Sequence, residues 1–129
     1  MSLLLDTHAF AWLFLGDSRL PLRLRAFLEA YESDIYVSAI SAYEMAQKHR
    51  LGNWAEVAPL IDGFDRLVHD AHFAVLNVTP RHAIRAGLMP GEHRDPFDRM
   101  LVAQAAVEGL RIVSGDKDLK LLGAEPVWR

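Results

Sequence analysis

The sequence predicts an α/β fold in which helices cover both faces of a central parallel sheet, giving three layers. Short apolar runs typical of buried strands alternate with longer segments of helical spacing, which is the pattern of a parallel sheet. Hydrophobic residues make up 51% of the 129 residues, enough for a sizeable core. Neither a repeat nor a linker interrupts the chain, so we expect residues 1–129 to form a single domain.

The first half of the chain is expected to hold two strands and four helical segments. Gly16 and Gly52 end two of the helices, Pro21 suits a first helical turn, and Gly63 interrupts the last segment. In chain order we expect strand 3–6, helices 7–15 and 21–33, strand 35–38, and helices 41–51 and 54–72.

The second half is expected to hold three strands and two helices. Asp95 precedes Pro96, a pairing typical of an N-cap and a first helical position, and Gly109 lies near the end of the helix. In chain order we expect strand 73–78, helix 80–89, a loop over 90–94, helix 96–110, strand 111–114 and a short last strand over 126–128.

Composition excludes several classes of protein. The chain has no cysteine, which rules out disulfides and thiolate chemistry. Its first residues lack a basic segment, and its apolar runs are too short to cross a bilayer, so we expect a cytoplasmic protein without a membrane association. The net charge of −3 argues against a general nucleic-acid coat, although four acids in one site would account for that charge.

Four acids are expected to meet at one edge of the sheet. Asp6 ends the first strand, Glu44 opens the helix after the second, and Asp116 follows the fourth. Asp98 begins the helix that leads back into the fourth strand, so it returns to the same carboxyl edge, where open α/β sheets bind ligands. Each acid alone also fits a local role: a strand end, a capping box with Ser41, a helix-dipole partner or a turn former.

Such a cluster of carboxylates calls for a cation. With oxygen ligands and no cysteine, the expected ion is Mg²⁺ or Mn²⁺, which neutralises phosphate and activates water for attack on it. Thr7 and Ser114, each beside or near a proposed ligand, are candidates for orienting that water. A helix cap and a turn residue are the alternative roles of the two hydroxyls.

The same residues resemble the PIN-domain family, and specifically the VapC toxins of bacterial and archaeal toxin–antitoxin pairs. The matching segments, spread over nearly the whole chain, are Leu3-Leu-Leu-Asp-Thr-His8 with Trp12, Ser38-Ala-Ile-Ser41 with Glu44, Lys48-His-Arg-Leu-Gly52, His93-Arg-Asp-Pro-Phe-Asp-Arg99 with Leu101 and Ala103-Gln-Ala105, and Val113-Ser-Gly-Asp116. The block Asp95-Pro-Phe-Asp-Arg99 is the specific one. Such proteins often carry threonine where this chain has Ser114, which keeps the hydroxyl.

The resemblance implies a PIN-like sandwich and a Mg²⁺- or Mn²⁺-dependent endoribonuclease. It also implies a homodimer that a cognate antitoxin inhibits. Asp6, Glu44, Asp98 and Asp116 match the family's metal-binding acids. RNA needs cationic contacts around such a centre, and we expect Arg94, Arg99 and Lys117 to supply them.

Other residues have simpler explanations. Lys48 lies four residues after Glu44, as in a helical ion pair. His8 is expected to tuck into the first helical turn rather than act as a base. His69 and His72 could share a helix face as a metal pair, but no third ligand is evident. The first helix is apolar most of the way round, either because it is wholly buried or because it meets a dimer or antitoxin partner.

Two other functions fit less well. An aspartate-nucleophile phosphatase using Asp6 would want a second acid two residues on, where the chain has His8. A catalytically silent binding module would not need all four acids.

Overall fold

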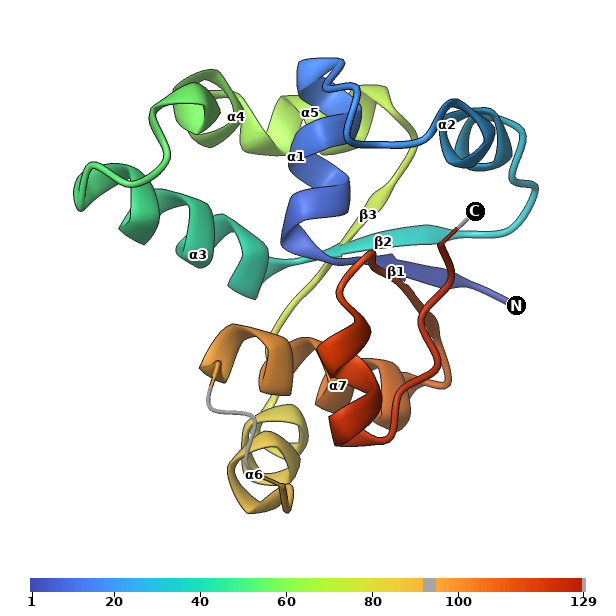
Figure 1. Cartoon of the computed structure of the whole chain (residues 1–129), viewed down its shortest axis with the longest axis vertical. Coiled ribbons are helices and arrows are strands. Elements are labelled where there is room, and N and C mark those ends of the chain that lie inside the picture. Colours follow the sequence, from blue (N-terminus) through green and yellow to red (C-terminus); the bar gives the residue numbers. More distant parts are fainter. Residues whose placement is uncertain (92–94, 129) are drawn as a thin grey trace.

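The computed structural model describes residues 1–91 and 95–128, and in them four parallel strands form one sheet in the order β3-β2-β1-β4 (Figure 1). The strands are β1 (Leu3–Leu5), β2 (Ile35–Ser38), β3 (Ala74–Leu76) and β4 (Arg111–Val113). Leu5 pairs with Val37 on one side and with Val113 on the other, so β1 and its neighbours end together at one edge. This edge is the carboxyl edge on which the acids were expected.

Helices cover both faces of this sheet, as predicted. They are α1 (Thr7–Leu15), α2 (Leu22–Glu29), α3 (Ala39–Arg50), α4 (Ala58–Asp62), α5 (Phe64–Asp70), α6 (Pro80–Leu88) and α7 (Pro96–Glu108), with 3₁₀ turns η1 (Ala55–Val57) and η2 (Lys117–Leu122). The helices α1, α2, α4 and α5 lie on one side of the sheet, whereas α6 and α7 lie on the other (Figure 1). No helix within the described ranges is long and apolar enough to span a membrane.

The alternation of side chains along β1 divides the core into two parts. Leu3 and Leu5 pack into the larger cluster with Phe10 of α1, whereas Leu4 packs against Leu101 of α7 on the opposite face. All three leucines are fully buried, because successive side chains of a strand point to opposite faces and both faces here are covered. The acid that follows β1 is thereby anchored between two packed layers.

Several boundaries differ from the sequence prediction; the largest shift at a helix end is in α2, which ends at Glu29 and not near residue 33. Helix α3 begins two residues early because Ser38, and not Ser41, caps it by accepting a hydrogen bond from the Ile40 N–H (3.0 Å). The predicted helix over 54–72 is three pieces, η1, α4 and α5, with its break at Gly63 as expected.

The predicted last strand over 126–128 is wrong. Only one bridge forms there, between Val127 and Val113 of β4. The preceding Pro126 has no N–H to donate to a ladder, which limits the pairing.

Helix α5 also ends at Asp70, and His72 has a left-handed backbone (φ 60°), so His69 and His72 do not share a helix face.

Candidate active site

Asp6 follows β1 directly and caps α1 at its N-terminus. Its Oδ1 accepts a hydrogen bond from the Ala9 N–H (2.8 Å), and only 7% of the residue is exposed. Burial is the main cause that raises the pKa of Asp6 to about 7; the charges of Asp98 and Glu44 add to this rise, and the hydrogen bonds from Ser114 and Ala9 oppose it. The charged form of this buried acid is therefore unfavourable, and a bound cation would offset that cost.

Glu44 lies in the second turn of α3, and its charge acts on Asp6. It is 3% exposed, and the Thr7 hydroxyl donates to its Oε1 at 2.6 Å. Lys48, one helical turn on, pairs with Oε2 at 2.5 Å, which confirms the expected ion pair. Asp6, and not Thr7, caps α1. The Thr7 hydroxyl instead bonds Glu44 and so links α1 to α3.

The start of α7 separates its two acids, as predicted. Asp95 is the N-cap, and its Oδ1 accepts hydrogen bonds from the N–H groups of Phe97 (2.9 Å) and Asp98 (3.3 Å). Asp98 is the third residue of the helix and half-buried, and its charge acts on Asp6. The carboxylate of Asp98 is therefore close enough to belong to the same acidic cluster.

Asp116 lies in the turn after β4 and is exposed. The Ser114 hydroxyl accepts a hydrogen bond from the Asp116 N–H (3.0 Å), and Oδ1 of Asp116 caps η2 through the Asp118 N–H (2.8 Å). Ser114 thus acts as a turn residue while also bonding Asp6. Lys117 follows as an exposed residue of η2. The turn brings Asp116 to the mouth of a hollow that Asp6 also lines.

The acids share the carboxyl edge, but they do not form a closed coordination shell. Among residues 1–91 and 95–128, no three acidic or histidine side chains lie close enough together to hold one ion. We name the set Asp6, Glu44, Asp98 and Asp116 the acidic edge. The carboxylate of Glu44 is already bonded by Thr7 and Lys48.

Two of the three basic residues expected to contact RNA lie within the described part of the chain, and their surroundings differ. Nη2 of Arg99 donates to the Met89 carbonyl oxygen (2.5 Å), which ties α7 to the end of α6. Lys117 is exposed next to Asp116. Arg94 lies outside the described residues. Their contact with a substrate stays a prediction.

Two adjoining hollows at the acidic edge contain residues that sequence reasoning did not assign to the site. One, of about 510 Å³, includes Asp6, Asp116 and Trp128; the other, of about 410 Å³, includes Lys48 and Trp54. His8, Trp12 and Arg19 line both hollows, so the two are continuous. We name them together the tryptophan groove, because all three tryptophans of the chain line it.

A close approach of the backbone shapes one wall of this groove. A Cβ atom at Gly115 would lie 2.9 Å from the Trp128 ring, too close for any side chain there. Trp128 in turn meets Trp12 edge-on, with ring centroids 6.1 Å apart. Gly115 therefore allows the indole to lie over the turn that carries Asp116.

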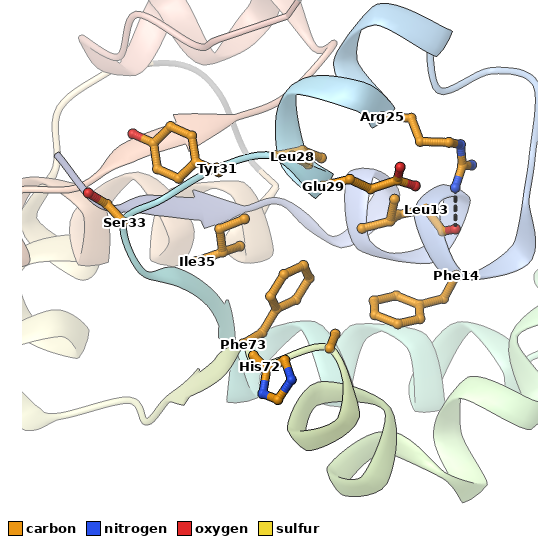
Figure 2. Close-up of a pocket in the computed structure, with 11 residues that line it drawn as sticks. Leu13, Phe14, Arg25, Leu28, Glu29, Tyr31, Ser33, Ile35, His72 and Phe73 are labelled. Atoms are coloured by element: carbon orange, nitrogen blue, oxygen red, sulfur yellow. Dashed lines mark hydrogen bonds between the residues drawn. The ribbon is translucent and has the colours of Figure 1, made fainter.

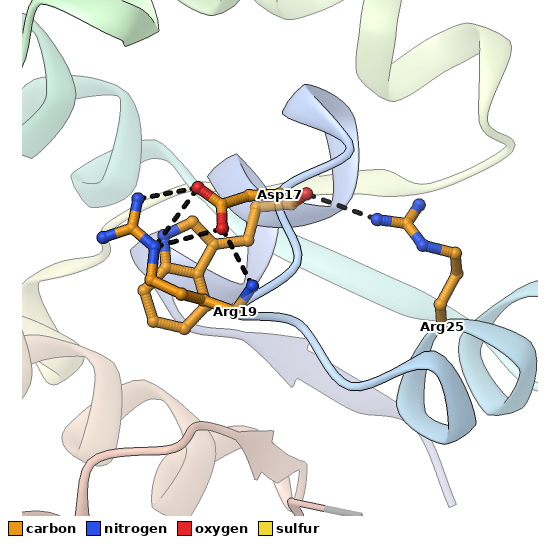
Figure 3. A network of polar contacts seen from close by, with 4 residues as sticks. Asp17, Arg19 and Arg25 are labelled. Carbon is orange, nitrogen blue, oxygen red and sulfur yellow. Dashed lines mark hydrogen bonds and ion pairs between the residues drawn. The ribbon is translucent and has the colours of Figure 1, made fainter.

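His8 was expected to tuck into the first turn of α1, but it is exposed and stacks on Trp54. The ring centroids are 4.8 Å apart with 27° between the planes. Arg19 lies with its guanidinium 4.9 Å from the Trp12 ring centroid and pairs with Asp17 at 2.6 Å (Figure 3). Positions 8, 19 and 54 share no periodicity, so only the packing of α1 against the loop after α3 reveals them.

Another cavity, of about 490 Å³, lies at the opposite, amino end of β2 and β3 (Figure 2). Its lining is mainly apolar and includes Leu13, Phe14, Leu28, Ile35 and Phe73. The first helix is therefore not wholly buried: Leu13 and Phe14 are half-buried and face this cavity. The surplus apolar surface expected on α1 lies here.

The sequence and the fold match known proteins. A model of the PIN domain matches residues 3–125. Ribonuclease VapC22 of Mycobacterium tuberculosis is 28% identical over 120 residues, covering 92% of this chain and 90% of that protein.

Three solved structures share the fold. Mycobacterium tuberculosis VapC20, described as a Sarcin-Ricin loop cleaving toxin, aligns with a TM-score of 0.68 at 17% identity, over 98% of this chain and 99% of its own. FitAB bound to a DNA fragment gives 0.68 at 17%, over 97% and 93%. VapBC2 from Rickettsia felis on a promoter fragment gives 0.59 at 14%, over 95% and 93%. With the match over residues 3–125, the chain belongs to the PIN domain family.

Proposed function

We propose that the chain is a divalent-metal-dependent endoribonuclease, the toxin of a type II toxin–antitoxin pair. The observation that carries this proposal is Asp6, a buried carboxylate whose pKa is raised to about 7 by burial and by the charges of Asp98 and Glu44. Four acids on one sheet edge are costly for stability and useful for holding a cation. Membership of the PIN family and the similarity to a ribonuclease support the same activity.

The donor set fits Mg²⁺ or Mn²⁺. Asp6, Glu44, Asp98 and Asp116 offer only oxygen ligands, which these hard ions prefer. When bound, the ion would supply positive charge against the scissile phosphate and acidify an attacking water. The charges of Asp98 and Glu44 both raise the pKa of Asp6, which supports a role for a cation at these carboxylates.

The chain's own side chains prepare the edge for this ion. Thr7 holds one oxygen of Glu44, and Ser114 bonds Asp6, so two hydroxyls fix the orientation of two carboxylates. Lys48 pairs with Oε2 of Glu44, so a cation bound at this oxygen would compete with the Lys48 ammonium group. That Thr7 and Ser114 also orient a water, and that Arg94, Arg99 and Lys117 bind the substrate, are further parts of this proposal.

The proposal is tested with labelled single-stranded RNA and the purified chain. Cleavage is expected with Mg²⁺ or Mn²⁺, and it should stop in excess EDTA and return when the metal is restored. Calorimetry with Mn²⁺ alone gives an independent measure of binding at the acidic edge. Cleavage that continues undiminished in EDTA, with contaminating nuclease excluded by the Asp6→Asn protein purified in parallel, contradicts the mechanism.

An antitoxin protein and a second copy of the chain are the proposed partners. The structural relatives FitAB and VapBC2 are described as bound to DNA fragments, and the second as bound to its promoter. An antitoxin segment that covers the acidic edge should block RNA cleavage without any nucleic acid present. Unchanged cleavage at saturating antitoxin would show that inhibition does not act at this edge.

A further inference from the structure

We propose that the tryptophan groove is a nucleotide subsite in which an unpaired base next to the scissile phosphate stacks on His8, with Arg19 contacting the adjoining phosphate. This inference rests on the proposed ribonuclease function and names where the substrate strand runs. It rests on the continuity of the groove with the acidic edge, on its aromatic lining and on the way its cations are paired.

The groove starts where the chemistry would occur. Asp6 and Asp116 line its first hollow, so a phosphodiester held at these acids has the groove as its neighbouring space. The second hollow continues past His8 to Trp54. The volumes of about 510 and 410 Å³ lie within the usual range of ligand sites, roughly 300–1,000 Å³.

His8 offers the surface on which a base can stack. One side of its ring lies on Trp54, which is 9% exposed and fixes the ring from behind. His8 itself is exposed and lines both hollows, so a base placed on it would extend an existing stack. Stacking of a base on an aromatic side chain is worth about 1–3 kcal/mol and tolerates any base.

The basic side chains of the groove are already paired with acids, so RNA binding there needs base stacking as well as charge. Lys48 is paired with Glu44, and Arg19 with Asp17, whose pKa the Arg19 hydrogen bond lowers to about 2. The groove also contains the acids Asp6, Asp116 and Glu56. Because both cations are already paired, these acids leave the groove with a net negative charge, and electrostatic attraction alone would not hold an RNA strand there. Arg19 keeps 63% of its side chain exposed and can share its guanidinium with a phosphate.

The lining also favours RNA over a helical protein segment. Among the described residues that line the two hollows, none is leucine, isoleucine, valine or methionine. A helix-in-groove partner needs such aliphatic surface, which the cavity of Figure 2 provides with Leu13, Leu28 and Ile35. Planar rings and a guanidinium are instead the surfaces that single-stranded nucleic acid uses.

Binding is measured in the Asp98→Asn background by tryptophan fluorescence, since every tryptophan of the chain lines the groove. The probes are a short single-stranded oligoribonucleotide and the same strand with abasic positions. The intact strand should quench the emission and bind about 10-fold more tightly than the abasic strand. His8→Ala should remove this difference. Arg19→Gln should weaken both probes and lower the slope of affinity against salt by about 0.7.

His69→Ala and Arg81→Gln are the matched controls, exposed residues outside the groove, and should bind like the parent. In the active background, His8→Ala should raise KM about 10-fold and leave kcat near that of the parent. If the parent cleaves RNA and the His8→Ala and Arg19→Gln variants equal it in KM and in RNA binding, the subsite proposal is wrong and the nuclease proposal stands. Equal binding of both probes, or quenching by an antitoxin peptide and not by RNA, also overturns the subsite proposal. If no preparation cleaves RNA but the base-dependent binding and its loss in His8→Ala are seen, the subsite stands and the nuclease proposal fails.

Discussion

The two ends of α7 carry two polar clusters, each with at least one buried member, whose charges are balanced in opposite ways. At its start, Asp98 adds negative charge to Asp6 at the acidic edge and helps raise the Asp6 pKa to about 7. At its end, Glu108 accepts a hydrogen bond from Nε2 of His82 at 2.7 Å. Nδ1 of the same ring accepts from the Thr79 N–H (3.0 Å), so both nitrogens of this fully buried histidine are satisfied.

This difference distinguishes a candidate ligand site from a cluster that stabilises the packing of two helices. The His82 pair links α6 to α7 with complementary donors and acceptors, so it should contribute to stability and need no ligand. The acidic edge places the charges of Asp98 and Glu44 near the buried Asp6, so it should lower stability until a cation binds. Substitutions at the two clusters should therefore have opposite effects on stability and on cleavage.

The largest expected effect is loss of cleavage at the start of α7. Asp98→Asn should remain folded and lose more activity than the roughly 100-fold that removal of an outer-shell partner costs a metal site. Asp95→Asn is the matched control and should keep both Mn²⁺ binding and cleavage, because Asp95 uses Oδ1 on backbone N–H groups. RNA cleavage rates and calorimetry with Mn²⁺ test the assignment of Asp98 as the ligand and Asp95 as the cap. A dead Asp95→Asn and an active Asp98→Asn would reverse the assignment.

At the other cluster the expected loss is in stability. His82→Ala removes a fully buried ring and leaves the Thr79 N–H without its acceptor, so the free energy of unfolding should fall by about 3 kcal/mol. The exposed His69→Ala should change it little. Urea unfolding measures both, and the folded His82→Ala protein should still cleave RNA. A neutral His82→Ala would remove the contrast between the clusters.

Asp6→Asn should change stability in the opposite direction. The pKa of Asp6 rises on folding from 3.8 to about 7, so between these values the folded chain holds the extra proton and its stability falls as pH rises. Asn cannot ionise but still caps α1. In EDTA at pH 8 the free energy of unfolding of the variant should therefore exceed that of the parent by up to about 4 kcal/mol.

The check on this prediction is the unfolding free energy in EDTA from pH 4 to 8. The decline between about pH 4 and 7 should be smaller in Asp6→Asn than in the parent. Asp62→Asn, an exposed acid on α4, is the control and should follow the parent. An Asp6→Asn protein that unfolds more readily than the parent in EDTA would show that burial and like charges do not destabilise this edge.

The smallest expected effect concerns the cap of α7. Asp95→Ala removes the acceptor of two N–H groups and should cost about 1 kcal/mol, whereas Asp95→Asn should cost a few tenths. Thermal unfolding of the two variants measures the difference. Equal costs would mean that the cap contributes through charge rather than through its hydrogen bonds.

Most of the elements, and the edge on which the acids lie, could be predicted from the sequence. Strand β1 and helix α1 were predictable because a short apolar run and a glycine stop act on neighbouring residues. The cap at Asp95 and the position of Asp98 followed from Pro96 in the same way. Asp6 and Asp116 could be assigned to one edge because parallel strands end together.

Tertiary structure alone decided what these residues touch. The bond from Thr7 to Glu44 joins residues 37 positions apart, and the pair of His82 with Glu108 joins residues 26 apart. The stacking of His8 on Trp54 and the placing of Trp128 over Gly115 likewise depend on separate segments packing together. Local signals reflect dihedral angles and hydrogen bonds a few residues apart, whereas these contacts form only when both faces of the sheet are covered and distant side chains compete for the same space.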